Sequence, residues 1–265
     1  MKARRPTFSF EDAQAFWVPE MPAYGHNLNG GSLTLPYLEP YLIQVLKQAR
    51  DRLQESNPDL VRDIDVFSRQ EANHFRAHAA YNRVLRRQYE GIEEFEAEIR
   101  ADFESFLEDR SLEWNLAYCD GFESIGLISG ELFFGPMAGV LETADPQVRG
   151  LWEWHLAEEI EHRNVCHDVL KALYPGWRTR ISGFRYARHH LQGFGNRVMR
   201  HLLAQDEAAG RLPKDRRSRL RRRLVAARAA AFALPRNLWV LAPGYGPARR
   251  VEGPTVEAGL ARSEV

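Results

Sequence analysis

Two helical stripes in this 265-residue sequence turn polar at mid-length, and each does so with a Glu-x-x-His pair. The first pair is Glu71 with His74, and the second is Glu159 with His162. The apolar residues around each pair recur at alternating spacings of three and four, which is the period of a helix face packed inside a bundle. A buried carboxylate is costly unless it is paired or coordinated. Two such pairs at the same depth therefore favour one shared divalent metal site.

The composition is that of a globular protein with a hydrophobic core, because 44% of the residues are hydrophobic and 27% are charged. The sequence has no uninterrupted apolar run of about 18 residues, the length of a membrane-spanning helix. The basic start, Met1–Arg5, is not followed by the apolar stretch of a secretory signal. Cys119 and Cys166 fall on predicted helix faces. We therefore expect a cytoplasmic protein with two reduced, buried thiols.

The net charge is zero but unevenly distributed along the chain. From Gly176 to Val265 there are 19 lysines and arginines against six acidic residues, so this part carries +13 and the rest of the chain −13. The basic residues are densest in one short segment that contains Arg216, Arg217, Arg219, Arg221, Arg222 and Arg223. Such a helix is suited to lie on an anionic membrane surface, or alternatively to dock on the acidic part of the same chain. Few aromatic residues accompany it, which disfavours a nucleic-acid partner.

The pattern predicts an all-α protein, with a ferritin-like four-helix bundle over residues 32–176 and two further helices after it. We expect an irregular N-terminal arm over 1–31, a basic helical extension packed on the bundle over 177–251, and a polar tail over 252–265. The bundle helices are expected to begin at about residue 36 or 40, 58, 112 and 146, and to end at about 53, 88, 142 and 174. The two later helices are expected at about 181–206 and 214–234. The long connector over 89–110, itself largely helical, is expected to be the single crossover of such a bundle. Pro40 is tolerated in a first helical turn, so we expect Glu39 near the start of its helix.

A dinuclear site in such a bundle takes one Glu from each of two helices and a Glu-x-x-His pair from each of the other two. Residues three apart point the same way on a helix, so each pair presents both of its groups to the same metals. Four carboxylates balance two divalent ions, and oxygen and nitrogen ligands favour iron, with manganese or zinc as alternatives. Taken singly, either pair is equally typical of a solvated helix face. The complete set is Glu39, Glu71, His74, Glu123, Glu159 and His162.

Two further histidines lie one turn from these candidate ligands. His78 follows His74, and His155 precedes Glu159. If their helices are antiparallel, both histidines lie at the same end of the site, about 6 Å along the helix axis from the ligands. They are candidate catalytic residues, as an extra ligand or a proton-handling pair; the alternative is two hydrogen-bonded core histidines. Candidates for contacts behind the metal ligands are Asn73, Asp168 and Cys166.

Two longer motifs resemble a known family. Gln70-Glu71-Ala72-Asn73-His74, followed by His78 and Tyr81-Asn82, resembles the QEAxH…H…YN signature of the predicted metal-dependent hydrolase family. Residues 152–163 are similar to the WxWHxxEExEHR signature of the same family, and residues 27–39 to its N-terminal block. The resemblance covers roughly residues 5–205 and implies a ferritin-like fold with two metals. The sequence departs from the family where a Pro-x-Phe-His-Pro element is common, because residues 243–247 read Pro-Gly-Tyr-Gly-Pro and lack the His.

Three functions are compatible with these features. The ligand set and expected fold favour a di-iron centre that uses O₂ to oxidise a small, rather apolar substrate, with Glu71 and Glu159 as bridging ligands. The first alternative is the metal-dependent hydrolysis that the family description states, with His78 or His155 as general acid or base. The second alternative is a non-catalytic bundle that binds a membrane surface through its basic C-terminal segment.

Overall fold

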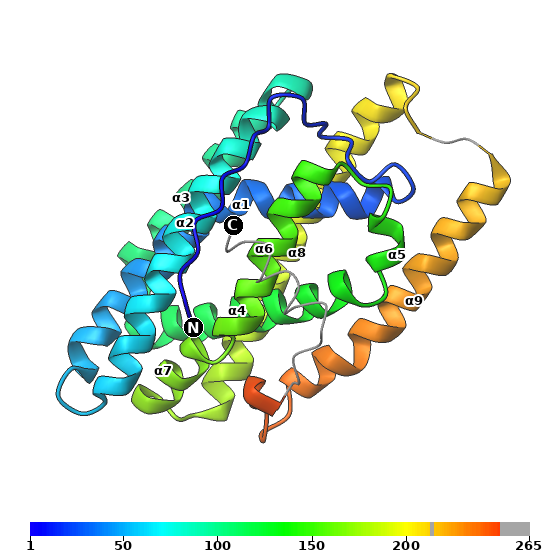
Figure 1. Ribbon diagram of the computed structural model, residues 1–265. Coiled ribbons are helices and arrows are strands. Elements are labelled where there is room, and N and C mark those ends of the chain that lie inside the picture. The colour runs from blue at the N-terminus through cyan, green and yellow to red at the C-terminus, as the bar shows by residue number, and fades with distance from the viewer. Residues whose placement is uncertain (213–214, 250–265) are drawn as a thin grey trace.

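The computed structural model describes residues 1–212 and 215–249, and all regular elements within these ranges are helical (Figure 1). The prediction of an all-α protein is therefore confirmed for this part of the chain. The helices are α1 (Pro22–Leu53), α2 (Pro58–Gln88), α3 (Ile92–Asp109), α4 (Leu112–Phe134), α5 (Ala138–Leu141), α6 (Pro146–His162), α7 (Val165–Leu173), α8 (Trp177–Ala208), α9 (Arg216–Val240) and the 3₁₀ helix η1 (Pro247–Arg249).

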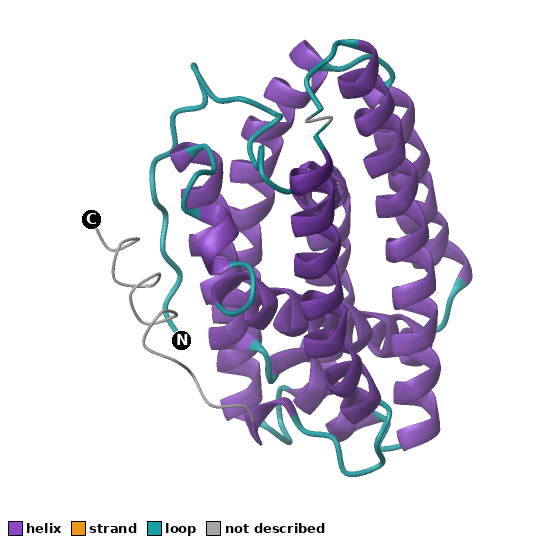
Figure 2. Ribbon diagram, turned by 90° about the vertical axis from the view of Figure 1, so that its right-hand side faces the viewer, coloured by secondary structure: helices purple, strands orange, loops and turns teal. Residues whose placement is uncertain are grey.

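Four helices enclose a common interior. Helix α1 contacts α2 and α4, and α6 contacts both α2 and α4, so the contacts form a closed ring. Helix α7 continues from α6 and packs on the same two partners. Outside the ring, α3 contacts α1, and α8 contacts both α1 and α4. A second view shows long helices packed side by side, with loops connecting them (Figure 2). Helix α9 contacts α4 and runs along one edge of the molecule (Figure 1). The C-terminal helices therefore pack on the ring of helices that carries the candidate ligands.

The irregular N-terminal arm ends at Met21, because α1 begins at Pro22. The expectation that the arm extends to residue 31 is therefore wrong. Gly30 and Gly31, at the end of the predicted arm, lie inside α1 and do not form a turn. Gly30 permits close packing of two helices. A Cβ atom on Gly30 would lie 3.1 Å from the Cα of Gly195 in α8. Glycine at both 30 and 195 lets α1 and α8 cross with their backbones nearly in contact.

Two prolines lie inside α1, so the expectation that Pro40 occupies a first turn is also wrong. A proline in a helix has no N–H to donate to the carbonyl four residues earlier. Pro36 leaves the Ser32 carbonyl without its helical donor, and the side-chain amide of Asn82 in α2 donates to that oxygen at 2.8 Å. The neighbouring helix thus replaces the missing hydrogen bond. Glu39 consequently lies deep within α1 rather than near its start.

Other helix boundaries differ from the predicted ones where the chain bends. Helix α2 has the predicted bounds. The helix expected to run to residue 142 ends at Phe134, before Gly135-Pro136, and α5 follows. The helix expected over 146–174 is divided after His162 into α6 and α7. Helices α8 and α9 are longer than predicted. Pro235 lies inside α9, and the residue whose carbonyl it leaves without a helical donor, Ala231, is exposed to solvent. The predicted tail over 252–265 lies outside the described residues.

Cys119 and Cys166 are both buried and form no disulfide, as expected. Burial raises the pKa of each thiol well above its usual value. Of the helices that the structure describes, none combines the length and the apolar character needed to cross a membrane.

Candidate metal centre

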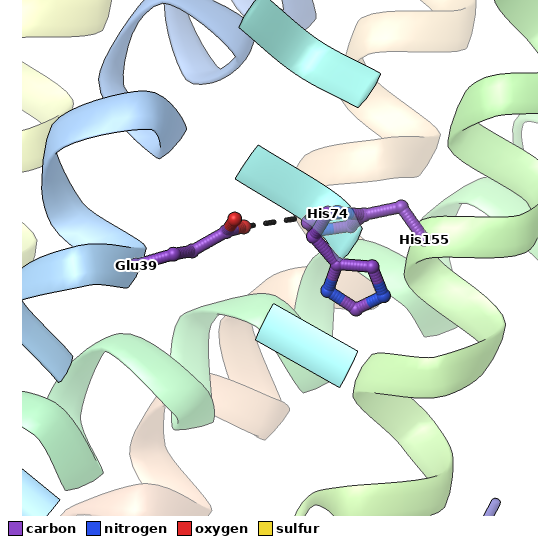
Figure 3. Close-up of side chains that lie close together, drawn as sticks. All are labelled: Glu39, His74 and His155. Carbon is purple, nitrogen blue, oxygen red and sulfur yellow. Dashed lines mark ion pairs between the residues drawn. The ribbon is translucent and has the colours of Figure 1, made fainter. Parts of the chain in front are cut away.

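The six candidate ligands converge in the interior of the helix ring. Each has at most 3% of its surface exposed. Potential ligand atoms form two groups, and within each group all of these atoms lie within 4.8 Å of one another. The first group is Glu39 with His74 and His155, and the second is Glu71 with Glu159 and His162. Figure 3 shows the first group, in which the carboxylate of Glu39 from α1 approaches imidazoles from α2 and α6. Residues from segments far apart in sequence therefore meet at one place.

The carboxylates of Glu71 and Glu159 lie between the histidines. Oε1 of Glu159 is 3.4 Å from Nε2 of His155, 3.4 Å from Nε2 of His162 and 3.9 Å from Nδ1 of His74. Oε1 of Glu71 is 3.5 Å from Nδ1 of His74 and 3.3 Å from Nε2 of His162. Both carboxylates are thus shared between histidines, which is the position a bridging ligand requires.

The other two carboxylates lie at the margins of this group. Oε2 of Glu123, from α4, is 3.4 Å from Nε2 of His162. Oε1 of Glu39 is 3.9 Å from Nδ1 of His155. Gly126 is one turn from Glu123, and a Cβ on it would lie 2.4 Å from Oε2 of Glu159. The missing side chain at Gly126 makes room for the Glu159 carboxylate.

The tautomer of His162 is set by a hydrogen bond on its outer side. Its Nδ1 lies 3.1 Å from Oε1 of Gln70, and the amide group of Gln70 donates to Glu161 at 2.7 Å. The oxygen of Gln70 is therefore the acceptor, and Nδ1 of His162 carries the proton. Nε2 is left to face the carboxylates, which is the arrangement of a metal-binding imidazole held from behind. Phe67 packs edge-on against this ring, with the ring centroids 4.7 Å apart.

His74 is held in the same way by Glu158, which was not among the predicted site residues. Nε2 of His74 donates to Oε2 of Glu158 at 3.0 Å, and Glu158 is fully buried. Both the backbone N–H and the Nη1 of Arg4 donate to the other Glu158 oxygen at 3.1 Å. The N-terminal arm thus stabilises the carboxylate that orients His74. The usable sequence signal was the position of Glu158 beside Glu159 on a helix buried on several sides.

Replacing Glu158 with Gln should weaken metal binding without removing a ligand. The amide keeps the shape but loses the charge that strengthens the bond to His74, and outer partners of this kind change metal affinity by about 10- to 100-fold. We expect a fall in that range, measured by competition with a chromogenic chelator. Glu153→Gln, a partly exposed glutamate on the same helix, is the matched control and should bind metal as the wild type does. Equal affinities for the two variants would contradict this role of Glu158.

The two candidate catalytic histidines lie side by side, with ring centroids 4.8 Å apart. The hydroxyl of Ser32 donates to Oδ1 of Asn82 at 2.6 Å, so it accepts from Nδ1 of His78 at 2.9 Å. Nε2 of His78 then carries a lone pair and has no hydrogen-bond partner among the described residues. Burial, together with the nearby His155 and His74, holds the pKa of His78 well below its usual value. His78 is therefore a neutral imidazole held in one tautomer.

His155, which was predicted as an extra ligand or a proton-handling residue, lies beside the carboxylates of Glu159 and Glu39. It belongs to the first ligand group with Glu39 and His74, so it is a candidate metal ligand as well as a candidate catalytic residue. Burial and the neighbouring His74 lower its pKa well below the usual value, with the charge of Glu159 acting in the opposite direction.

The residues predicted to support the ligands are placed differently. Asn73 does not contact an imidazole; its amide donates to the carbonyl oxygen of Arg4 at 2.9 Å and holds the N-terminal arm. Asp168 is exposed on α7, so its predicted contact with a ligand is wrong. The break between α6 and α7 separates its helical phase from that of His162. Cys166 is fully buried, and Glu123 is the second cause, after burial, of its raised pKa.

The residues present suit a pair of cations. Both carboxylate oxygens of Glu39, Glu71, Glu123 and Glu159 lack hydrogen-bond partners in the described part of the chain, as do Nδ1 of His74 and Nε2 of His162. Buried groups of this kind are costly unless something else compensates them. Four carboxylates with imidazole nitrogens form an oxygen-rich set suited to iron, manganese or zinc. The donors include two candidate ligand groups, Glu39 with His74 and His155, and Glu71 with Glu159 and His162.

Without a metal, protons must compensate these charges. Burial and the Glu159 charge raise the pKa of Glu123 to about 8. For His74, burial acts to lower the pKa, but the hydrogen bond to Glu158 and the nearby carboxylate of Glu71 raise it to about 9. Burial acts to raise the pKa of Glu159, yet His162, His155 and His74 lower it to about 2. Burial and neighbouring glutamates hold the pKa of Glu39 well above its usual value.

Metal-free protein should therefore become less stable as the pH rises. Glu123 and His74 have folded pKa values of about 8 and about 9, above the usual 4.5 and 6.5, so their protons stabilise the fold at low pH. The lowered pKa values of His78 and His155 act in the opposite direction, but only below the usual value of 6.5. The loss of stability should therefore be seen as the pH rises from about 6.5 to about 9. Metals compete with the same protons, so metal affinity should increase over the same interval. The melting temperature of chelator-treated and metal-loaded protein, followed against pH, checks both trends. If the melting temperatures of the two forms changed with pH in parallel, metal binding would not be coupled to the loss of these protons.

A cavity of about 670 Å³ reaches the centre at His155 and Glu159. Its walls come from α1, α4, α6, α8 and α9, and they are predominantly apolar. Trp152 and Leu156 from α6 and Phe122 from α4 lie beside the two candidate ligands. A cavity of this size and character admits a small, mostly apolar molecule.

The comparisons with known proteins agree with the resemblance in the two motifs. The family model described as predicted metal-dependent hydrolase matches residues 2–250. No curated protein and no solved structure gave a significant match. Because the family model covers nearly all of the chain, it includes α8 and α9 as well as the four helices that carry the candidate ligands. The chain belongs to the predicted metal-dependent hydrolase family.

Proposed function

We propose that this protein is a hydrolase with a dinuclear metal centre that cleaves an ester or phosphoester bond in a small, largely apolar substrate. The observation that carries the proposal is the buried group of partnerless carboxylates and imidazoles that opens at His155 and Glu159 onto an apolar cavity. The family description supports hydrolysis over the oxidation that the ligand set alone favours. We also propose a ferritin-like arrangement, in which α3 is the crossover between the pair α1–α2 and the pair formed by α4 with α6 and α7.

The residues of the chain have distinct tasks in this proposal. Two divalent metals, when bound, supply Lewis acidity and a water molecule that ionises near neutral pH. Glu39, Glu71, Glu123, Glu159, His74 and His162 would hold them. His155 lines the cavity with His78 behind it, and both are kept neutral by burial, so the pair is placed to accept a proton. The apolar walls exclude bulk water, which strengthens electrostatic interactions within the site.

A second candidate function is O₂-dependent oxidation of a substrate in the same cavity. Four carboxylates around two metal positions, all beneath apolar walls, favour this chemistry with iron. The iron would supply the electrons for O₂ reduction, and the chain would supply the dry, oriented cavity.

The two candidates are separated by loading the same preparation with different metals. Metal-free protein is loaded with zinc, manganese or, under anaerobic conditions, iron(II), and assayed with chromogenic carboxylic and phosphate esters. The hydrolase proposal predicts metal-dependent ester cleavage with zinc or manganese and no O₂ uptake. Rapid O₂ consumption by the iron form, with no ester cleavage by any form, would favour the oxidase. Failure to take up any metal would contradict both.

A further inference from the structure

Helix α9 has an exposed apolar stripe that no described part of the protein covers. The stripe comprises Leu220, Leu224, Ala227, Ala231, Leu234 and Leu238, spaced alternately by four and three, so all lie on one face. The four leucines are 58–61% exposed. At the rise of an α-helix the stripe is about 27 Å long. Large apolar side chains on a single helix face in this number mark an interaction surface.

Arginines border this stripe on both sides. By helical position, Arg217, Arg221 and Arg228 fall on one flank, and Arg216, Arg219 and Arg223 on the other, all of them exposed. Arg221 also pairs with Glu20 at 2.7 Å and remains 61% exposed. The helix contains eight arginines and no acidic residue. Several of these arginines lie in the first turns of α9, where positive charges interact unfavourably with the helix dipole. They also repel one another. An external anionic partner would offset both unfavourable interactions.

The opposite face of α9 packs on the protein, so the stripe points outward. Val225 and Ala229 contact the hydrophobic core, and Arg236 pairs with Glu131 of α4 at 2.7 Å. Helix α9 itself lies along an edge of the molecule (Figure 1). Two stripe residues, Ala231 and Leu234, also line the cavity that reaches the candidate metal centre. The exposed stripe and the cavity wall are thus one continuous apolar surface.

We propose that α9 docks on an anionic lipid surface and that the substrate is an amphiphile that enters the cavity from that surface. A basic amphipathic helix in this position inserts its leucines at the boundary of the acyl chains and places its arginines among the anionic headgroups. A contact between two copies of α9 would instead bring the same rows of arginines together, which disfavours a symmetric dimer through this face. The substrate class rests on the proposed function; the docking of α9 does not.

Co-sedimentation of the full-length, metal-loaded protein with vesicles tests the docking. We expect binding to vesicles of phosphatidylcholine with phosphatidylglycerol, little binding to phosphatidylcholine alone, and weaker binding at high salt. The double substitutions Leu220→Ser with Leu224→Ser, and Arg217→Ser with Arg221→Ser, should each reduce partitioning by about tenfold or more. The matched controls are Trp177→Ser, an exposed tryptophan on α8, and Arg62→Ser, an exposed arginine on α2; both should bind as the wild type does.

The outcomes separate the two proposals. No binding to anionic vesicles, or equal binding by the leucine variant, overturns the docking. A concentration-dependent dimer that the leucine substitutions abolish also overturns it, in favour of a contact between copies of the chain. A water-soluble chromogenic ester should be cleaved equally by wild type and leucine variant, whereas a long-chain ester dissolved in anionic vesicles should be cleaved faster by the wild type. Vesicle binding by a protein that takes up no metal would overturn the proposed function and leave the docking intact.

Discussion

Replacing Glu159 with Ala should reduce metal affinity by more than about a hundredfold, beyond the loss typical of an outer partner, and abolish turnover. Oε1 of Glu159 lies within 3.9 Å of three imidazoles, from His74, His155 and His162, more than any other candidate ligand contacts. Its removal takes one ligand from each of the two proposed metal positions. Metal content after dialysis, measured by elemental analysis, and ester cleavage of the reloaded protein give the result.

The variant must be shown to fold before the loss is attributed to the site. Far-UV circular dichroism and gel filtration of the metal-free forms serve this purpose. Glu159→Gln, which keeps the side-chain volume, should lose affinity in the same direction, because a neutral amide cannot balance a divalent ion. Glu153→Gln on the same helix is the control. A folded Glu159→Ala protein that retained two metals would rule out the shared carboxylate and the geometry built on it.

Replacing Gly183 with Ala should destabilise the protein by about 3 kcal/mol or more, at the upper end of the usual cost of overpacking. A Cβ on Gly183 of α8 would lie 2.1 Å from the carbonyl oxygen of Ala117 in α4. From the other side, a Cβ on Gly121 would lie 2.8 Å from the Cα of Phe184. Both obstacles are backbone atoms, so the two helices must separate. Denaturant titration measures the change.

The same substitution should weaken metal binding, because α4 carries Glu123 two residues from Gly121. Gly193→Ala, on the same helix, is the matched control: apart from the adjoining backbone of α8, no atom of the described residues lies within 4 Å of the added Cβ. It should stabilise the helix by about 0.5–1 kcal/mol, the usual gain for alanine over glycine in a helix interior. Destabilisation of similar size by both substitutions would show that the contact between α4 and α8 is less tight than described.

The contributions to the site differ in how far the sequence could predict them. The Glu-x-x-His pairs were predictable because their spacing matches the helix repeat, which is a local property. Glu39 was assigned correctly to the first long helix, but it was expected near the start of that helix and lies deep within it. The rule for proline that led to this expectation considers only the helix itself. In the structure Asn82, from another helix, supplies a donor to the Ser32 carbonyl. Local rules cannot include a hydrogen bond from a neighbouring helix.

Glu158 and Asp168 show the same limit from opposite directions. Glu158 was not among the predicted site residues, yet it is fully buried against His74. Asp168 was expected beside the ligands, yet it is exposed, since the helix is broken between α6 and α7. Periodicity indicates one buried face of a helix, but a helix enclosed on several sides buries neighbouring residues as well. A break in the helix also resets the phase for every residue that follows.

The sequence by itself determined the helical class, the family, and the residues whose carboxylates and imidazoles are able to meet. These follow from periodicity and motif spacing, which act over a few residues. Only the tertiary structure decided that Glu158 and Arg4 hold His74, and that α9 lines a cavity beside the candidate ligands. The physical reason is that burial and hydrogen bonding between distant segments depend on how the helices pack, and no local pattern encodes that packing.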